Sequence, residues 1–185
     1  DTIGDTRVRT RGEVEIARVE GPLRIRTDGD VRIHEVAGDV DVRLDEGSIV
    51  VRRIRGDAEL RTGWGGIEAS HVEGGLVARS GRGAVEVQDQ GGPIEAVTER
   101  GTISASFRGD PRGRLETSRG AVDVLLPATG RVSLDAISRR GRVQLADGFR
   151  IPGAPAEDRV TGQLNGGGGS LRLFTARGSV HVRPR

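Results

Sequence analysis

Hydrophobic and polar residues alternate in short segments, each of which begins just after a glycine. In residues 38–42 (GDVDV) and 83–87 (GAVEV), the second and fourth residues after the glycine are aliphatic. Such alternation, rich in β-branched residues and bounded by glycine, predicts a half-buried β-strand. No stretch shows an apolar stripe of helical period with capping residues, so we expect almost no helix.

The glycines that begin these segments recur with a period of 18 residues. Five of them are each 18 residues apart: Gly29, Gly47, Gly65, Gly83 and Gly101. A second set with the same spacing lies between them: Gly38, Gly56, Gly74 and Gly92. A fixed repeat indicates one structural unit stacked on itself, and a coil of parallel strands requires this constant phase whereas a meander does not. We therefore expect an all-β fold, a parallel β-solenoid.

The repeat also predicts buried columns along the rod axis. The first contains Val31, Ile49, Ile67, Val85 and Ile103, and the second contains Ile33, Val51, Ala69, Val87 and Ala105. A third contains Val36, Ile54 and Val72 and is expected to end at Gln90. We expect about nine rungs, beginning at glycines 12, 29, 47, 65, 83, 101, 120, 141 and 178. At about 4.8 Å per rung, the rod would be about 40 Å long.

We expect residues 1–185 to form a single solenoid domain. The repeat is interrupted twice, at residues 107–113 and 147–165. The second interruption contains Pro152, Gly153 and Pro155. It is interpreted either as a surface loop or flap that caps the last rungs, or as a loop that shapes a binding edge.

Composition narrows the choice of partners. All 29 basic residues are Arg, and 27 carboxylates leave a net charge of only +2, so we do not expect nucleic acid as a partner. The chain has no Cys, which excludes disulfides, thiol catalysis and cysteine-bound metals. No apolar run approaches the ~18 residues that a membrane-spanning helix needs.

Arginine residues stand directly before several of the glycines that begin rungs. Five of them are expected to form a ladder along one edge of the rod: Arg82, Arg100, Arg119, Arg140 and Arg177. Stacked guanidinium groups repel one another unless carboxylates or bound anions lie between them. One interpretation is an edge neutralised from within by Glu68, Glu86 and Asp123. The other is a strip that binds an anionic glycan, a phosphate-bearing polymer or a lipid head group.

Two more columns accompany this ladder. Hydroxyl residues just upstream in phase are expected to hydrogen-bond the turn backbone: Thr62, Ser80, Thr98, Thr117, Ser138 and Thr175. A second arginine column contains Arg26, Arg43, Arg61 and Arg79, with Asp41, Glu59 and Glu95 in the same register. We interpret this second column as a solvated face that suppresses lateral aggregation.

Neither a metal site nor a catalytic site is expected. His34, His71 and His181 fall at different phases of the repeat and so do not share a column. The aspartates at 30, 39 and 57 recur too irregularly for calcium-binding repeats. Polysaccharide-active β-helices need clustered carboxylates in a cleft walled by long loops, and most turns here are too short to build one. We therefore expect no cofactor.

The C-terminal third carries more specific motifs in residues 117–127 (TSRGAVDVLLP), 135–145 (DAISRRGRVQL) and 162–182 (GQLNGGGGSLRLFTARGSVHV). These resemble a family of bacterial β-strand-repeat proteins of unknown function, often described as adhesins. Its hallmark ending is matched by Leu164–Gly168 and Thr175–Val180. The resemblance implies a right-handed parallel β-solenoid in exported or membrane-tethered proteins, serving adhesion or envelope-stress sensing. The family has no established catalytic residues.

These observations lead us to expect a non-catalytic, extracytoplasmic solenoid that acts as an adhesin-like or cell-envelope binding module. We expect any export segment to lie outside these 185 residues. An alternative is a structural protein whose solenoids join end to end into filaments, as in bactofilins, because a terminal rung exposes unpaired strand edges. A polysaccharide-active enzyme is a third and more distant alternative.

Overall fold

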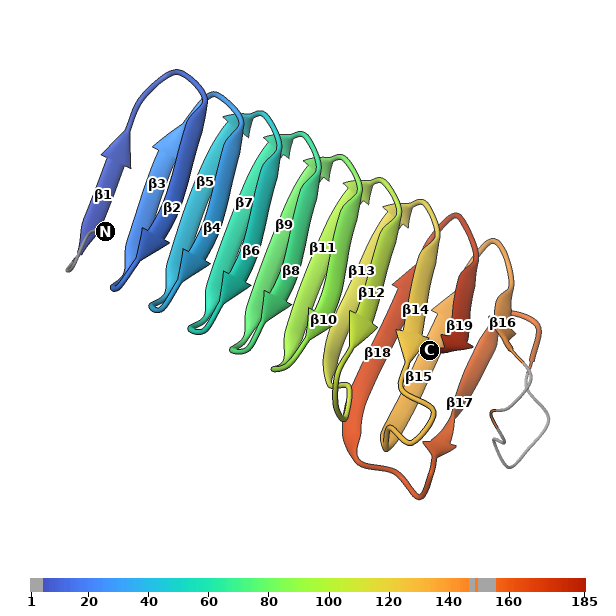
Figure 1. Ribbon diagram of the computed structural model, residues 1–185. Coiled ribbons are helices and arrows are strands. Elements are labelled where there is room, and N and C mark those ends of the chain that lie inside the picture. The colour runs from blue at the N-terminus through green and yellow to red at the C-terminus, as the bar shows by residue number, and fades with distance from the viewer. Residues whose placement is uncertain (1–4, 147–148, 150–155) are drawn as a thin grey trace.

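Each turn of the chain contributes one strand to each of two facing sheets, so the protein is a β-solenoid (Figure 1). The computed structural model describes residues 5–146, 149 and 156–185. Ten strands form one sheet, in the spatial order β1 (Thr6–Arg9), β3 (Leu23–Thr27), β5 (Val40–Glu46), β7 (Ala58–Trp64), β9 (Leu76–Arg82), β11 (Ile94–Arg100), β13 (Gly113–Arg119), β18 (Gly169–Thr175), β15 (Val132–Ser138) and β17 (Arg159–Leu164). Nine strands form the other, in the order β2 (Val14–Val19), β4 (Val31–Val36), β6 (Ile49–Ile54), β8 (Ile67–Val72), β10 (Val85–Gln90), β12 (Ile103–Phe107), β14 (Val122–Leu126), β19 (Val180–Pro184) and β16 (Val143–Leu145).

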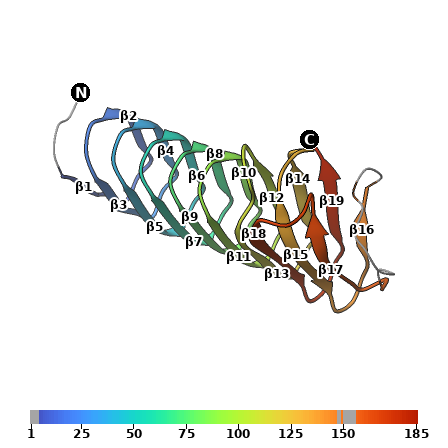
Figure 2. The ribbon, with the colours of Figure 1, turned by 90° about the horizontal axis from the view of Figure 1, so that it is seen from below.

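The described residues contain no helix, and all strand pairs except β15–β17 are parallel. Viewed from below, the turns form a regular coil that becomes less regular near the C-terminus (Figure 2). These features confirm the expected all-β parallel solenoid, while the expected nine rungs are only an approximate count. No helical segment in the described part of the chain has the length and hydrophobicity needed to cross a membrane.

The core consists of the aliphatic columns that the 18-residue period predicts. In the first column, each residue pairs in register with the next one 18 positions along the chain. All five members, Val31, Ile49, Ile67, Val85 and Ile103, are at most 2% exposed. The second predicted column, from Ile33 to Ala105, is also buried. The repeat therefore sets which side chains face inward.

The third column does not end at Gln90, and that expectation was wrong. Gln90 is 1% exposed and pairs in register with Phe107, which continues the column. The Gln90 side chain is tolerated inside because its Nε2 donates a hydrogen bond to the carbonyl of Gly74 at 2.7 Å. A buried polar group with a hydrogen-bond partner avoids the cost of burying an unpaired one.

The last turns are not stacked in chain order, which corrects the order expected for the rungs that begin at glycines 120, 141 and 178. Strands β18 and β19 lie between β13–β14 and β15–β16, so the C-terminal turn fills a slot between two earlier turns. The chain reaches this slot from β17, which runs antiparallel on the far side of β15. Pairing on both sides satisfies the backbone groups of β18 and places the hallmark ending inside the stack.

The two segments that interrupt the repeat differ in structure. Residues 107–113 connect β12 to β13, and Asp110 in this segment accepts a hydrogen bond from the backbone N–H of Arg131 at 2.9 Å. Within 147–165, residues 147–148 and 150–155 lie outside the described residues. Residues 159–164 form β17, which covers the edge of β15 at the end of the ten-stranded sheet.

The β17–β18 connection is held by Asn165. Its side-chain amide donates to the carbonyls of Ala128 at 3.0 Å and Gly130 at 2.9 Å. Asn165 has a φ of 52°, and Gly166 and Gly167 follow with φ values of 83° and 76°. Asn tolerates this left-handed conformation better than most residues, so one side chain supplies both the turn geometry and the anchor.

Replacing Asn165 with Ala is expected to lower the free energy of unfolding by about 2 kcal/mol, because two hydrogen bonds are lost and the backbone is strained. Asn165→Gly removes the same hydrogen bonds but relieves the strain, and it should cost about 1 kcal/mol. Urea unfolding of both variants measures the two contributions. Equal stability of the Ala variant and the wild type would show that Asn165 does not hold the connection.

Candidate functional site: an arginine ladder

One corner of the solenoid carries a column of large side chains at the ends of the strands of the ten-stranded sheet. Glu46, Trp64, Arg82, Arg100 and Arg119 are paired in register from turn to turn. Backbone hydrogen bonds extend the column, because Gly120 N–H donates to Arg177 and Gly178 N–H donates to Arg140. We call the five arginines the arginine ladder, in the spatial order Arg82, Arg100, Arg119, Arg177 and Arg140. The structure therefore brings together all five residues that the repeat selects.

The local sequence turns these arginines outward. Each ladder residue ends a strand or follows it closely, and a glycine comes next. The backbone is fully engaged: for example, the Arg100 carbonyl accepts a hydrogen bond from Gly83 N–H at 2.9 Å. Two residues earlier, the hydroxyl column points inward, and each hydroxyl donates to a turn glycine at 2.7–3.1 Å: Thr62, Ser80, Thr98, Thr117, Thr175 and Ser138. The hydroxyls thus hold the turns, as expected, and leave the guanidinium groups in solvent.

None of the five ladder arginines forms an ion pair with a carboxylate of the described residues. The expected neutralisers are engaged elsewhere: Glu68 with Arg52 at 3.2 Å, Glu86 with Gln88 at 2.8 Å, and Asp123 with His181 at 2.7 Å. All three carboxylates belong to the nine-stranded sheet and bind partners on that sheet. The interpretation of an internally neutralised edge is therefore wrong for this ladder.

The ladder concentrates positive charge on an exposed line. Adjacent parallel strands are about 4.8 Å apart, so the ladder is about 19 Å long. Two unit charges one turn apart, at about 4.8 Å, repel by about 1 kcal/mol in water. All five side chains are exposed. An anion placed between neighbouring guanidinium groups would relieve this repulsion and accept their paired N–H donors.

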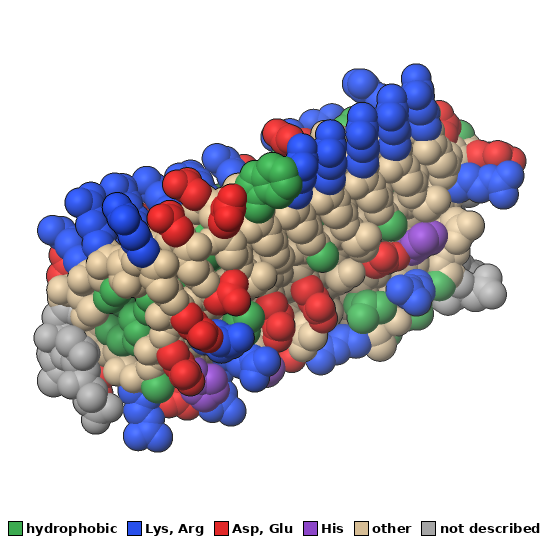
Figure 3. Space-filling view, turned by 90° about the horizontal axis from the view of Figure 1, so that it is seen from above, with side chains coloured by type: hydrophobic (Ala, Val, Ile, Leu, Met, Phe, Trp, Pro, Cys, Tyr) green, Lys and Arg blue, Asp and Glu red, His purple; other side chains and the backbone are tan. Residues whose placement is uncertain are grey.

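Aromatic and acidic residues flank the two ends of the ladder. At the first end, the guanidinium of Arg82 lies 4.0 Å from the centroid of the Trp64 ring, a cation–π contact. Trp64 is 54% exposed, and beyond it lies the exposed carboxylate of Glu46. Figure 3 shows this row of basic side chains ending at a hydrophobic side chain, with acidic side chains beyond it. Past Arg140, the neighbouring segment supplies Glu157 and Asp158, both exposed.

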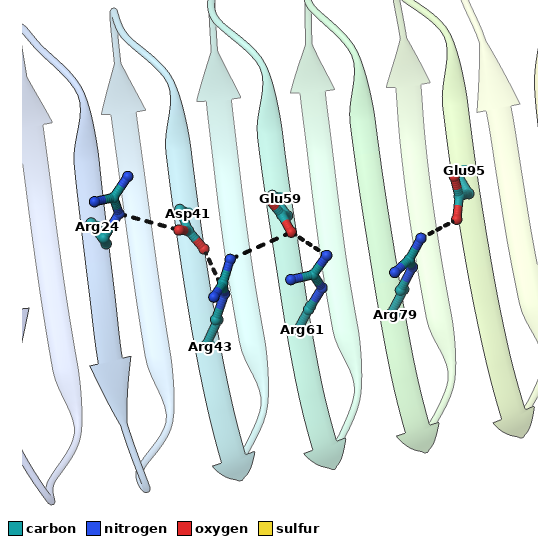
Figure 4. Close-up of polar contacts among 7 residues, drawn as sticks. All are labelled: Arg24, Asp41, Arg43, Glu59, Arg61, Arg79 and Glu95. Carbon is teal, nitrogen blue, oxygen red and sulfur yellow. Dashed lines mark hydrogen bonds and ion pairs between the residues drawn. The ribbon is translucent and has the colours of Figure 1, made fainter.

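The second arginine column differs from the ladder because its charges are compensated (Figure 4). Arg43 contacts Asp41 at 3.2 Å and Glu59 at 3.7 Å, and Arg79 contacts Glu95 at 2.6 Å. Arg61 pairs with Glu59 as well, and Arg24 pairs with Asp41. Arg26 has no ion pair among the described residues. The network supports the interpretation of a solvated, balanced face.

The other corner holds charged residues that the sequence patterns did not reveal. Five non-glycine residues in the same phase have φ values of 57–60°: Arg18, Glu35, Arg53, His71 and Asp89. Arg53 donates to Glu35 at 2.9 Å, and this hydrogen bond, with help from Arg18, holds the pKa of Glu35 below its ordinary value. Their common spacing along the chain was the available signal, but a left-handed conformation is uncommon at non-glycine residues and does not follow from that spacing.

The contact between His181 and Asp123 does not belong to a hydrolase triad. His181 contacts Asp123 at 2.7 Å, and Ser104 is the register neighbour of Asp123 rather than of His181. A hydrolase triad requires the imidazole between the hydroxyl and the carboxylate, so this order does not fit. Asp39 and Asp57 accept hydrogen bonds from backbone N–H groups of the next turn at 2.9 and 2.7 Å. The described residues contain no group of three or more potential metal ligands.

The main cavities lie away from the ladder. A groove of about 670 Å³ follows the ten-stranded sheet and is lined by Leu76, Val77 and Pro93 among others. A second cavity of about 770 Å³ lies at the other corner, beside Arg53, His71 and Arg55. Arg55 and Arg108, which both line this second cavity, have no ion pair among the described residues. The ladder is instead a solvent-facing strip, suited to an extended ligand.

The fold and this strip define the class of the protein: a β-solenoid repeat protein with a line of uncompensated arginines at one corner. Searches against known protein families, curated proteins and solved structures find no match for this chain.

Proposed function

We propose that this protein is a non-catalytic binding module that holds linear anionic polymers along the arginine ladder. The observation that carries this proposal is the alignment of five exposed guanidinium groups, one per turn, without a carboxylate partner among the described residues. A strip of this kind recognises regularly spaced carboxylate or phosphate groups. It would also attract them over a distance, in a salt-dependent manner.

The sequence resemblance supports a role at the bacterial cell envelope. The matched ending, Leu164–Gly168 and Thr175–Val180, forms the connection into β18 and the turn before β19. The family that these motifs resemble is found in exported or membrane-tethered bacterial proteins. We propose the same location here, with adhesion to an anionic polymer as the role of the ladder.

A binding role fits the geometry better than catalysis. The ladder is exposed along its whole length, and each of its five positions offers a guanidinium group. Excluding water from the reacting groups, which most enzymes require, is not achieved on an exposed corner. Guanidinium groups arranged in this way can orient a charged chain.

Arg100→Glu combined with Arg119→Glu is expected to weaken binding to a polyuronate by about tenfold or more, because two attractive contacts become repulsive. Wild-type binding should also weaken as salt rises. Binding is measured by calorimetry against polygalacturonate, polyphosphate and anionic lipid vesicles.

The matched control is Arg55→Glu combined with Arg108→Glu, which makes the same charge change at the other corner of the coil. This control should keep most of the affinity, and both variants should melt near the wild-type temperature. Equal losses of affinity in the two variants would show that the effect depends on net charge and that the ladder is not the binding site.

Self-association is a second candidate function. Strands β1 and β2 form the first edge of each sheet and have no strand partner on their outer side among the described residues. The opposite end is different, because β17 runs antiparallel to the stack. A parallel joint between β1 and β17 would therefore not continue the solenoid. Concentration-dependent light scattering tests this candidate, and rods with an axial repeat of one protomer would favour it over the binding module.

A further inference from the structure

The C-terminal turn, strands β18 and β19, occupies a slot whose two walls would fit each other without it. β18 lies between β13 and β15, and β19 lies between β14 and β16 (Figure 1). All four pairings with the walls are parallel. The inserted turn therefore separates two turns that are consecutive in the sequence.

The two walls have the same phase. Thr175 pairs with Thr117 on one side and with Ser138 on the other. The other sheet has matching register rows across the slot: Val122–Val180–Val143 and Val124–Val182–Leu145. Without the C-terminal turn, the walls could pair in register with each other while the same side chains faced the core.

The hydroxyl bonds at the corner would also be kept. The Thr175 hydroxyl donates to the carbonyl of Gly120 at 2.8 Å, and the Ser138 hydroxyl donates to the carbonyl of Gly178 at 2.7 Å. With the walls in direct contact, the Ser138 hydroxyl would take the place of Thr175 at Gly120. Closing the slot therefore leaves this buried hydroxyl with a partner.

The connection before β18 holds the C-terminal turn in place. It contains four consecutive glycines, residues 166–169, which can change direction at little steric cost. Asn165 binds two carbonyls of the β14–β15 connection, and the Arg131 Nε of that connection donates to the carbonyl of Gly167 at 3.1 Å. Opening these few bonds would free the turn to leave the slot.

We infer that the protein has two stacking orders. In the inserted order, the C-terminal turn fills the slot and buries four aliphatic side chains: Leu171, Leu173, Val180 and Val182. In the closed order, the turn has left the slot and β15–β16 stack directly on β13–β14. Burial of the four side chains makes the inserted order the more stable one. The closed order is available during synthesis before the C-terminal turn has been made.

The stacking order also sets the length of the arginine ladder, and this link rests on the proposed function. Arg177 lies between Arg119 and Arg140 in the inserted order. In the closed order, Arg119 and Arg140 are neighbours and Arg177 is released, so the ladder has one arginine fewer. A polyanion that contacts Arg177 binds the inserted order better and shifts the chain toward it.

Engineered cysteine pairs distinguish the two orders, because the chain has no cysteine of its own. Glu116, Phe174 and Ile137 form one register row across the slot. Glu116 and Ile137 are two strand spacings apart in the inserted order, about 9.6 Å, which is too far for a disulfide. They are about 4.8 Å apart in the closed order. Disulfide formation in Glu116→Cys combined with Ile137→Cys, with oxidised glutathione, therefore reports the closed order.

Two control pairs calibrate this measurement. Glu116→Cys combined with Phe174→Cys joins adjacent strands and should form its disulfide readily in the inserted order. Arg79→Cys combined with Glu116→Cys also spans two strand spacings, but β11 lies between them in chain order, so this pair should stay reduced. Peptide mapping of the monomer fraction identifies each link, and thermal melting verifies that each variant is folded.

The closed-order disulfide should form in the folded protein. Asn165→Gly should speed its formation about fivefold, because the connection loses the two hydrogen bonds that hold it. Saturating polyphosphate should slow its formation about twofold to fivefold, the effect of one more exposed ion pair. This slowing should be absent in Arg177→Ala.

The outcomes separate the inference from the proposed function. A closed-order disulfide that forms no faster than the Arg79–Glu116 control overturns the two stacking orders and leaves anionic-polymer binding intact. Faster formation that responds to Asn165→Gly and to polyphosphate as expected supports both. Formation that responds to polyphosphate equally with and without Arg177 overturns the link to the ladder. Absence of ladder-dependent binding in calorimetry overturns the proposed function and leaves the two stacking orders standing.

Discussion

Replacing Ile67 with Asp is expected to unfold the protein, with a loss of about 4 kcal/mol or more in the free energy of unfolding. Ile67 is 2% exposed and stands in the middle of the first core column, between Ile49 and Val85. The substitution removes a buried aliphatic side chain and puts an unpaired carboxylate in its place. A loss of this size is a large fraction of the stability of a typical domain. Circular dichroism during thermal and urea unfolding measures it.

Ala84→Asp is the matched control, because it adds the same charge at an exposed position one turn further along. This variant should melt within a few degrees of the wild type. If Ile67→Asp also left the melting temperature unchanged, the column would face solvent, and the stacking of turns described here would be wrong.

Gly65→Ala is expected to cost about 3 kcal/mol or more, although it adds a single methyl group. Gly65 has a φ of 143°, which L-residues rarely adopt, and a Cβ there would lie 2.0 Å from the carbonyl oxygen of Gly47. Relief of that overlap requires the two turns to separate. Separation would weaken the hydrogen bond from Gly47 N–H to the carbonyl of Trp64, which is 2.8 Å long and joins these two turns.

Gly109→Ala tests whether this cost is specific to the corner. A Cβ at Gly109 meets no atom within 4 Å, and the position has no positive φ, so this variant should be neutral or slightly stabilising. Denaturant unfolding of the two Ala variants gives the comparison. Similar stabilities would mean that the corner glycines are not required for close stacking.

The same corner glycines connect stability to the proposed function. Trp64 and the five ladder arginines are each followed by one of these glycines: Gly65, Gly83, Gly101, Gly120, Gly141 and Gly178. The close approach of turns at these glycines sets the separation of the guanidinium groups. A solenoid converts a period in sequence into a period in space, because residues of one phase stack at the strand spacing. A ligand with regularly spaced charged groups can then be bound by a single side chain in each repeat. The rest of the turn remains free to maintain the core.

Much of the fold was predictable because burial in a solenoid follows phase. The aliphatic columns, the inward hydroxyls and the five ladder arginines all follow from counting residues from the glycines. Gln90 was the exception within the core, since its burial depends on the carbonyl of Gly74 rather than on hydropathy. A hydropathy pattern records the type of side chain and contains no information about such a partner.

The sequence by itself determined the two-sheet repeat and which arginines share the corner, because both depend on local alternation and a constant 18-residue phase. Only the tertiary structure decided that Arg177 lies between Arg119 and Arg140, since that order results from β17 pairing with β15 and sending β18 into the slot. It also decided that the ladder stays uncompensated, because Glu68, Glu86 and Asp123 bind partners on the nine-stranded sheet. The position of a residue within the 18-residue repeat determines which face it lies on. Charge compensation instead depends on side-chain contacts between turns. The order of the last turns depends on strand pairing between segments far apart in the chain.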